Sequence, residues 1–194
     1  DKSVLMKHLS ALEILIIFVA DFETELLRLA PNLKWIQAIS AGVDNLPLKE
    51  INERGIILTN TRGIHKIQMA EFAIAAMINF ARSFHLMHRN QIKGLWDRSV
   101  PQAEIYGKIV GIIGLGSIGE EIARKASLFG MQVLGVQKNH RPIKYVDRAY
   151  GIEEMDKVFR ESDYIINLLP LTAETRKRID KRYFGLMKKT ACFI

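Results

Sequence analysis

Short apolar runs alternate along the chain with polar and amphipathic stretches, and this pattern predicts an α/β protein. Short apolar runs suit buried strands, whereas longer segments with apolar residues three or four apart suit helices. In the first part of the chain the predicted elements are a strand over residues 14–19, a helix over 22–30, a strand over 33–40, a helix over 46–52 and a strand over 56–59. Because strands and helices take turns, we expect the strands to form a parallel sheet.

Residues 67–80 form a predicted helix that is apolar on nearly every side. Such a helix must be covered on several sides, so we expect it between two domains or two subunits. Glu71 is its only formal charge; a paired structural carboxylate is the preferred interpretation, and a place near a site is the alternative. In the more polar segment 82–96, His85 and His88 lie three residues apart on one helical face. No third ligand has local spacing, so we prefer a solvated face and assign no metal.

The second part of the chain continues the alternation around one central unit of strand, glycine-rich turn, helix and strand. The predicted elements are a strand over residues 109–113, a helix over 118–129, a strand over 131–136, a helix over 152–159, a strand over 164–169, a helix capped by Thr172 or Thr175 and running through Arg178, a helical piece over 182–187 and a final strand over 191–194. The run over 109–113 is of the kind buried on both faces of a parallel sheet.

A glycine motif joins that strand to its helix: Gly114-Leu115-Gly116-Ser117-Ile118-Gly119. Gly114 permits the tight turn, Gly116 lets the backbone approach a pyrophosphate, and Gly119 lets the helix lie close to the strand. The head of the helix offers free N–H groups to phosphates. With a strand before it and an amphipathic helix and second strand after it, the motif predicts a dinucleotide site. The alternative is a tight strand-to-helix turn without a ligand.

The turn after the second strand of this unit reads Gln137-Lys138-Asn139-His140-Arg141 and contains no carboxylate. In sites that prefer NAD, an Asp or Glu near this position accepts hydrogen bonds from the ribose 2′-hydroxyl, whereas basic side chains suit a 2′-phosphate. The turn therefore favours NADP over NAD. The alternative is that these are only exposed turn residues.

Two further loops follow predicted strands, at the edge where open α/β sheets bind ligands. The first, Ala41-Gly42-Val43-Asp44-Asn45, has a glycine and neighbouring N–H groups that can hold a small anion such as a carboxylate, although an ordinary loop is preferred without further information. The second is Leu169-Pro170-Leu171-Thr172, in which Pro170 closes the strand because it cannot donate to a ladder. We expect this second loop to wall the cofactor pocket.

Composition narrows the class of protein further. With 194 residues, 48% of them hydrophobic, the chain can bury a proper core in one large domain or two small ones. The net charge is +7, but Lys and Arg are scattered between acids, so no nucleic-acid or membrane partner is expected. The single cysteine, Cys192, rules out a disulfide framework within the chain and fits a reducing, cytoplasmic compartment; we interpret it as a small hydrophobic residue.

Taken together, the ordered motifs resemble the D-isomer-specific 2-hydroxyacid dehydrogenases over almost the whole chain. The residues that carry the resemblance are Ser40-Ala41-Gly42-Val43-Asp44, Thr59-Asn60-Thr61, Ala70-Glu71, the segment from Gly107 to Gly119, and Leu169-Pro170-Leu171-Thr172 with Thr175. The resemblance implies two doubly wound parallel-sheet domains, a flavodoxin-like substrate domain over residues 1–81 and a Rossmann dinucleotide-binding domain over 82–194, both incomplete. It also implies an active site between them, and a homodimer.

The same resemblance implies roles for individual positions. The backbone of Ala41, Gly42 and Val43 would help to hold the substrate carboxylate. The cofactor would be contacted by Met69 from the long helix, by the glycine motif Gly114, Leu115, Gly116, Ser117, Ile118 and Gly119, by the ribose turn Gln137, Lys138 and Asn139, and by Leu169, Pro170, Leu171 and Thr175.

No catalytic residue is expected within the chain. In the family, the catalytic arginine follows the strand that corresponds to residues 191–194, and the acid and the histidine come later still. None of His65, His85, His88 and His140 has the strand-end position that the proton donor needs. We therefore expect a piece of a longer enzyme of roughly 300 residues, a size typical of two domains, and no turnover by the piece alone.

The expected activity is hydride transfer between NADPH or NADH and a small 2-keto or D-2-hydroxy acid. The alternative, from another class of function, is a cofactor-sensing, non-catalytic module of the corepressor kind. For either function, the helix over 67–80 would serve as a dimer seam.

Overall fold

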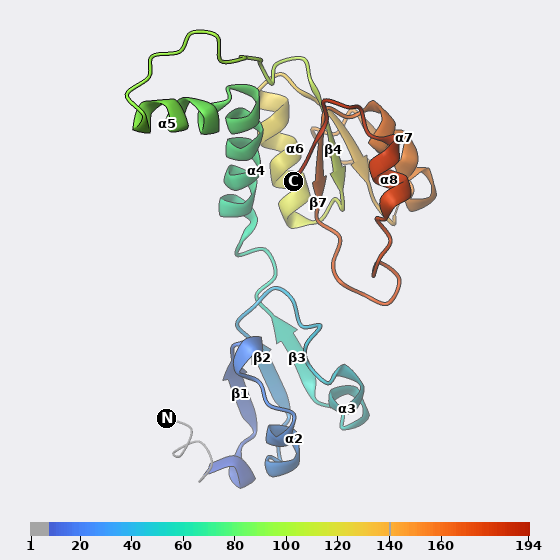
Figure 1. Cartoon of the computed structure of the whole chain (residues 1–194). Coiled ribbons are helices and arrows are strands. Elements are labelled where there is room, and N and C mark those ends of the chain that lie inside the picture. The colour runs from blue at the N-terminus through green and yellow to red at the C-terminus, as the bar shows by residue number, and fades with distance from the viewer. Residues whose placement is uncertain (1–7, 140) are drawn as a thin grey trace. The chain divides into compact units, whose positions relative to one another are not determined.

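The computed structural model describes residues 8–139 and 141–194, and the chain divides into two compact units. One unit ends at His65 and the other comprises Lys66–Ile194. Figure 1 shows the elements of both. His140, which the sequence analysis excluded as a proton donor, lies outside the described residues.

The first unit is a three-stranded parallel sheet with the strand order β1-β2-β3. Its elements are the 3₁₀ helix η1 (Leu9–Ala11), β1 (Ile14–Ile17), the 3₁₀ helix η2 (Val19–Asp21), α2 (Glu25–Leu29), β2 (Trp35–Ala38), α3 (Leu48–Glu53) and β3 (Ile57–Asn60). Apolar side chains from the strands and helices form one core, in which Leu27 and Ile36 are fully buried. The parallel sheet confirms the prediction, although β1 and α2 are shorter than expected.

The second unit is a five-stranded parallel sheet with the order β6-β5-β4-β7-β8. Its elements are α4 (Lys66–Ala81), α5 (Phe84–Ile92), β4 (Ile109–Ile113), α6 (Ser117–Leu128), β5 (Gln132–Val136), β6 (Arg148–Tyr150), the 3₁₀ helix η3 (Ile152–Glu154), α7 (Met155–Glu161), β7 (Tyr164–Asn167), α8 (Lys181–Leu186) and β8 (Cys192–Phe193). Central β4 pairs with β5 on one side and β7 on the other, as a doubly wound fold requires.

Helices cover both faces of this sheet (Figure 1). On one face α4 and α6 share a core with Val110 and Ile112 of β4. On the other face α7 and α8 share a second core with Ile113, in which Phe159 is fully buried. Alternate residues of β4 thus point into different layers, and this explains why the strand reads as a continuous apolar run.

Helix α4 belongs to the second unit, whereas the sequence analysis placed residues up to 81 in the first domain. Its buried side, which includes Ala73 and Met77, packs in the core that it shares with α6. Phe72 and Phe80 remain 63% and 51% exposed. Only one side of this nearly uniformly apolar helix is therefore covered by the described chain. The assignment of substrate and cofactor roles to the two units stays a prediction.

Ser83, with φ 52°, separates α4 from α5, at the predicted boundary between the segments 67–80 and 82–96. Two local differences from the predicted elements have identifiable causes. The helix predicted through Arg178 does not form; Lys177 has φ 56°, and the Thr175 hydroxyl donates to the Pro170 carbonyl within a series of turns. The edge strand β6 was missed because its three residues, Arg148–Tyr150, have no apolar run.

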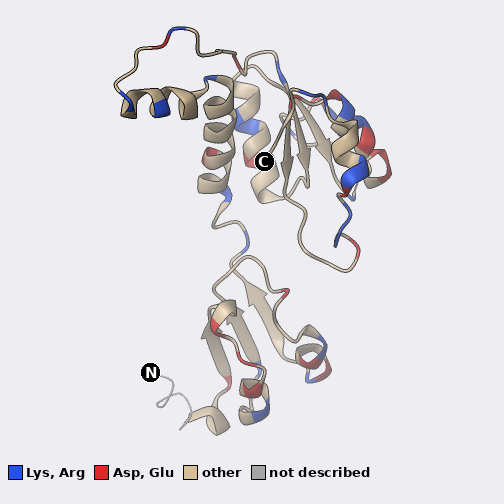
Figure 2. Cartoon of the chain, viewed as in Figure 1, with Lys and Arg blue, Asp and Glu red and all other residues tan. Residues whose placement is uncertain are grey.

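Charged residues of both signs are interspersed over the helices of each unit, and the strands carry few of them (Figure 2). The described chain has no helix long and apolar enough to cross a membrane.

Candidate functional site

The glycine motif forms the connection from β4 to α6, and two of its glycines are required by geometry. Gly114 has φ 108°, and a Cβ there would also lie 3.0 Å from the Leu168 carbonyl oxygen. A Cβ on Gly119 would lie 2.4 Å from the Gly114 carbonyl oxygen. Helix α6 therefore approaches the strand as closely as the sequence analysis predicted.

Gly116 is different, because an added Cβ would meet no atom within 4 Å. Its φ of −90° is open to other residues. Packing within the described chain therefore does not require glycine at this position. The open space lies beside the backbone, where the sequence analysis expects a pyrophosphate.

The head of α6 offers a row of free donors. Among the described residues, the N–H groups of Leu115, Gly116, Ser117, Ile118 and Gly119 donate no main-chain hydrogen bond; the first bond of the helix runs from Glu120 N–H to the Gly116 carbonyl. The positive end of the helix dipole lies at the same place. Consecutive unpaired N–H groups at a helix head form an anion site that suits a diphosphate.

Leu115 and Ile118 contribute their backbone to this row, because both side chains pack in the core. Leu115 is 7% exposed. Its side chain packs on Gly135, because a Cβ added to Gly135 would lie only 2.2 Å from Leu115 Cδ1. Ile118 packs against the α4 and α6 side of the core. The signal that singles out these residues is thus their position in the motif and not their side chains.

A groove of about 280 Å³ begins at Ser117 and follows the first turns of α6. Polar and charged side chains line most of it: Lys66, Ser117, Glu120, Glu121, Arg124, Ile143, Lys144 and Tyr145. The segment 143–145 carries no sequence motif and was not predicted as part of the site. Its place is visible only once β5 and β6 are paired.

The turn after β5 holds the predicted ribose residues. Gln137 is buried; its N–H donates to the Tyr150 carbonyl and its side-chain amide donates to the Arg141 carbonyl at 2.7 Å. This residue shapes the turn. Lys138 and Asn139 are exposed, and Lys138 Nζ lies 3.2 Å from Glu174 Oε2.

The loop after β7 lies beside both of these turns. Leu168 N–H donates to the Ile113 carbonyl at 2.8 Å, and this bond fixes the loop next to Gly114. Beyond Pro170, the hydroxyls of Thr172 and Thr175 are 3.1 Å apart. The ion pair of Lys138 and Glu174 connects the loop to the ribose turn. The structure therefore brings together the three cofactor segments predicted within the second unit, with Leu171 exposed.

The two other predicted contact sites belong to other segments of the chain. Met69 is 40% exposed on α4. The loop Ala41-Gly42-Val43 belongs to the first unit, where Asn60 Nδ2 donates to the Ala41 carbonyl at 2.7 Å and Ser40 Oγ donates to the Gly42 carbonyl. In the described chain the N–H groups of these three loop residues donate no hydrogen bond, so they are free to donate to a carboxylate.

The surroundings of the remaining candidate residues, Glu71 and Cys192, favour structural roles. Glu71 Oε1 lies 3.7 Å from Lys125 Nζ, which also lies 3.6 Å from Glu121 Oε1, so this pairing favours the structural interpretation of Glu71. Burial raises the pKa of the Cys192 thiol, and this favours the protonated, unreactive form. Among the described residues, no three His, Cys, Asp or Glu side chains are grouped as metal ligands.

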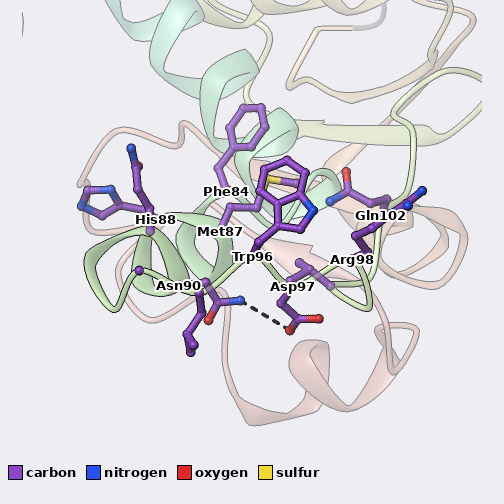
Figure 3. Close-up of a pocket in the computed structure, with 12 residues that line it drawn as sticks. Phe84, Met87, His88, Asn90, Trp96, Asp97, Arg98 and Gln102 are labelled. Atoms are coloured by element: carbon purple, nitrogen blue, oxygen red, sulfur yellow. Dashed lines mark hydrogen bonds between the residues drawn. The ribbon is translucent and has the colours of Figure 1, made fainter.

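A larger groove lies elsewhere, on the arm formed by α5 and the loop up to Gln102. It measures about 780 Å³ and is lined by Phe84, Met87 and Trp96, whose side chains gather in Figure 3. Trp96 is 92% exposed. His88, also drawn there, belongs to α5, and Asp97 accepts hydrogen bonds from Ser99. Its other lining residues include polar and charged ones, such as Asn90 and Arg98, and none of the lining residues belongs to the cofactor segments.

Residues 74–194 match the family model described as D-isomer specific 2-hydroxyacid dehydrogenase, NAD binding domain. Over its full length, the chain is 30% identical to a glyoxylate reductase from Thermococcus kodakarensis and covers 61% of that protein.

Two similar solved structures contain dinucleotides. One is an acyclic imino acid reductase in complex with NADPH and D-Arg, with a TM-score of 0.86 and 25% identity over all of this chain and 62% of that one. The other is a D-lactate dehydrogenase from Aquifex aeolicus complexed with NAD and lactic acid, with a TM-score of 0.84 and 26% identity over 97% and 57% of the two chains. The chain thus spans about three fifths of the length of the relatives that it matches.

Proposed function

Because the chain belongs to the D-isomer-specific 2-hydroxyacid dehydrogenase family, we propose that it binds a nicotinamide dinucleotide across the head of α6 and serves an oxidoreductase of small 2-keto and D-2-hydroxy acids. The observation that carries the proposal is the row of free N–H groups from Leu115 to Gly119 beside the open space at Gly116. These groups would hold the diphosphate, and the bound nicotinamide would supply or accept the hydride.

The favoured cofactor is NADPH. The turn after β5 presents Lys138 and Arg141 and contains no carboxylate of its own, so nothing in the turn itself would repel a 2′-phosphate. Gln137, which is buried and bonded within the turn, would contribute backbone shape. Among the relatives, one structure contains NADPH and another NAD, which supports a nicotinamide dinucleotide of either kind.

The substrate carboxylate would be held by the free N–H groups of Ala41, Gly42 and Val43. A Cβ on Gly42 would lie 2.9 Å from Asp44 Oδ1, so glycine in the middle of the loop fits its packing. A relative named as a glyoxylate reductase supports a small 2-keto acid as substrate. The single cysteine fits a reducing compartment, and we place the protein in the cytoplasm.

We further propose a homodimer in which the groove of the arm contacts a second copy. Trp96 and Phe84, which line the groove, are 92% and 48% exposed, and Ile92 of the same arm is 74% exposed. Exposed apolar clusters of this kind are typical of protein contacts.

Fluorescence titration of NADPH and NADH with the 194-residue chain tests the dinucleotide site. In Gly116→Ala the added methyl group would lie against the diphosphate, and losing even one charge-assisted hydrogen bond costs about 1.5–3 kcal/mol. We expect binding at least about tenfold weaker. Stability should stay the same, because the methyl group meets no protein atom within 4 Å.

Gly185→Ala, in α8, is the matched control and should bind like the parent chain, since its methyl group also meets nothing within 4 Å. No binding of either dinucleotide by the parent, or equal binding by Gly116→Ala, would contradict the proposal. Oxidation of NADPH in the presence of glyoxylate tests the reaction itself.

A further inference from the structure

Each of the two cations in the turn after β5 is paired with a glutamate from a different element. Lys138 Nζ lies 3.2 Å from Glu174 Oε2 in the loop after β7. The Arg141 guanidinium donates to the carboxylate of Glu120, in the first turn of α6. The four side chains together carry no net charge. The basic character that favours a 2′-phosphate in the sequence is therefore reduced by these carboxylates in the folded chain.

We propose that Glu120 and Glu174 determine how strongly the protein distinguishes NADPH from NADH, and that they restrain its preference for NADPH; this inference rests on the proposed dinucleotide site. A phosphate monoester has a charge of about −1.5 to −2 at pH 7, whereas the ribose hydroxyl of NADH is neutral. Each glutamate repels the phosphate directly. Each also occupies the cation that would bind the phosphate, so Lys138 and Arg141 must exchange a carboxylate for the phosphate.

The exposure of these pairs sets the size of the effect. The Lys138 and Glu174 side chains are 80% and 77% exposed, and those of Arg141 and Glu120 are 60% and 40% exposed. Water and salt screen interactions at such sites, so the exchange of partners is not prohibitive. Removing one carboxylate several ångströms from the phosphate should tighten NADPH binding about threefold at ~0.15 M salt, and removing both about tenfold.

The test compares Glu120→Gln, Glu174→Gln and the double variant of the 194-residue chain with the parent, by fluorescence titration of NADPH and NADH. We expect the NADPH dissociation constant to fall by these factors while that of NADH changes less than about twofold, because only NADPH carries the extra phosphate. The gain should shrink between ~0.05 M and ~0.5 M salt.

Glu161→Gln is the matched control. Glu161 also accepts from an arginine, Arg148, but this pair lies at the amino end of β6, whereas the ribose turn follows the carboxyl end of β5. In Glu161→Gln the ratio of the NADPH and NADH dissociation constants should equal that of the parent.

An unchanged ratio in the double variant would overturn the inference, as would equal shifts for both dinucleotides, which indicate that the ion pairs only position the loop. These outcomes leave the proposed function intact, since both cofactors still bind. Failure of the parent chain to bind either dinucleotide would instead count against the proposed function.

Discussion

At the scale of single residues, two glycines of the motif differ in whether the fold requires them. A methyl group on Gly119 meets backbone that cannot move cheaply, whereas one on Gly116 meets open space. Both positions look the same in the sequence pattern. The structure therefore assigns one glycine to the packing of α6 on β4 and leaves the other for a ligand.

Gly119→Ala should lower the free energy of unfolding by about 1–3 kcal/mol, the usual cost of overpacking. The added Cβ would lie 2.4 Å from the Gly114 carbonyl oxygen, so α6 must shift away from the strand. Gly185→Ala in α8 should instead raise stability by about 0.5–1 kcal/mol, because alanine favours the helix and nothing obstructs the methyl group. Urea denaturation of both variants measures the difference; a stability of Gly119→Ala equal to that of the parent would mean that the helix accommodates the methyl group.

The residue-level site was predictable where the chemistry is carried by backbone. The glycine spacing identified the N–H row because a tight turn and close packing require those glycines. The side-chain pairs Glu120 with Arg141 and Glu174 with Lys138 were not predictable. The partners of these pairs are 21 and 36 residues apart in the sequence, respectively, and only the folded sheet edge brings them together.

At the scale of elements, two aspartates connect neighbouring strands at the amino edge of the larger sheet. Asp163 Oδ2 accepts from Ile109 N–H, the first residue of β4, at 2.9 Å. Asp147 Oδ2 accepts from Val133 N–H in β5 at 2.7 Å. Each carboxylate thus accepts a hydrogen bond from a strand N–H group that would otherwise lack a partner. These contacts lie opposite the ligand edge and serve stability.

Asp163 should make stability depend on pH. Burial raises the pKa of its carboxyl, but the hydrogen bonds from Ile109 N–H and from Lys188 Nζ, at 2.9 Å, outweigh burial and hold the pKa below its ordinary value. The stability that Asp163 contributes is therefore fully present above about pH 4, the ordinary pKa, and is lost as pH falls through the lower folded pKa.

Asp163→Asn should cost about 1–2 kcal/mol at pH 7, and the difference from the parent should narrow as pH falls below about 4. Urea denaturation at several pH values measures it. The exposed Glu104→Gln is the control and should follow the parent at every pH. A difference that stays constant with pH would show that the charge of Asp163 is not what stabilises the strand start.

The predictability of elements followed their hydrophobic pattern. The buried strand β4 and the helix α6 were found with nearly their observed bounds, because both have long apolar faces. The edge strand β6 was missed, since it is only three residues long and owes its conformation to pairing with β5. The failed helix before α8 had suitable threonines for a cap, but Lys177 adopts a positive φ that ends regular structure there.

At the scale of the whole molecule, the distribution of apolar surface matters more than the net charge. The charges that sum to +7 are interspersed (Figure 2), whereas exposed apolar side chains gather on α4 and on the arm. The sequence predicted that the apolar α4 needs cover, but it did not predict the arm. Trp96 lies in a segment without regular structure, where periodicity carries no information.

These two surfaces give distinct predictions for the proposed homodimer. If the arm groove is the contact, Trp96→Asp should convert the 194-residue chain to a monomer at micromolar concentration, because a charge would be buried without a partner. Phe72→Asp, on the exposed side of α4, and Leu128→Asp, at the end of α6 and 70% exposed, should leave the dimer intact. Light scattering coupled to size exclusion would distinguish a mass of 22.1 kDa from twice that value. Dissociation by Phe72→Asp alone would move the contact to α4, as the sequence analysis expected, and a monomeric parent would exclude a stable dimer of this chain.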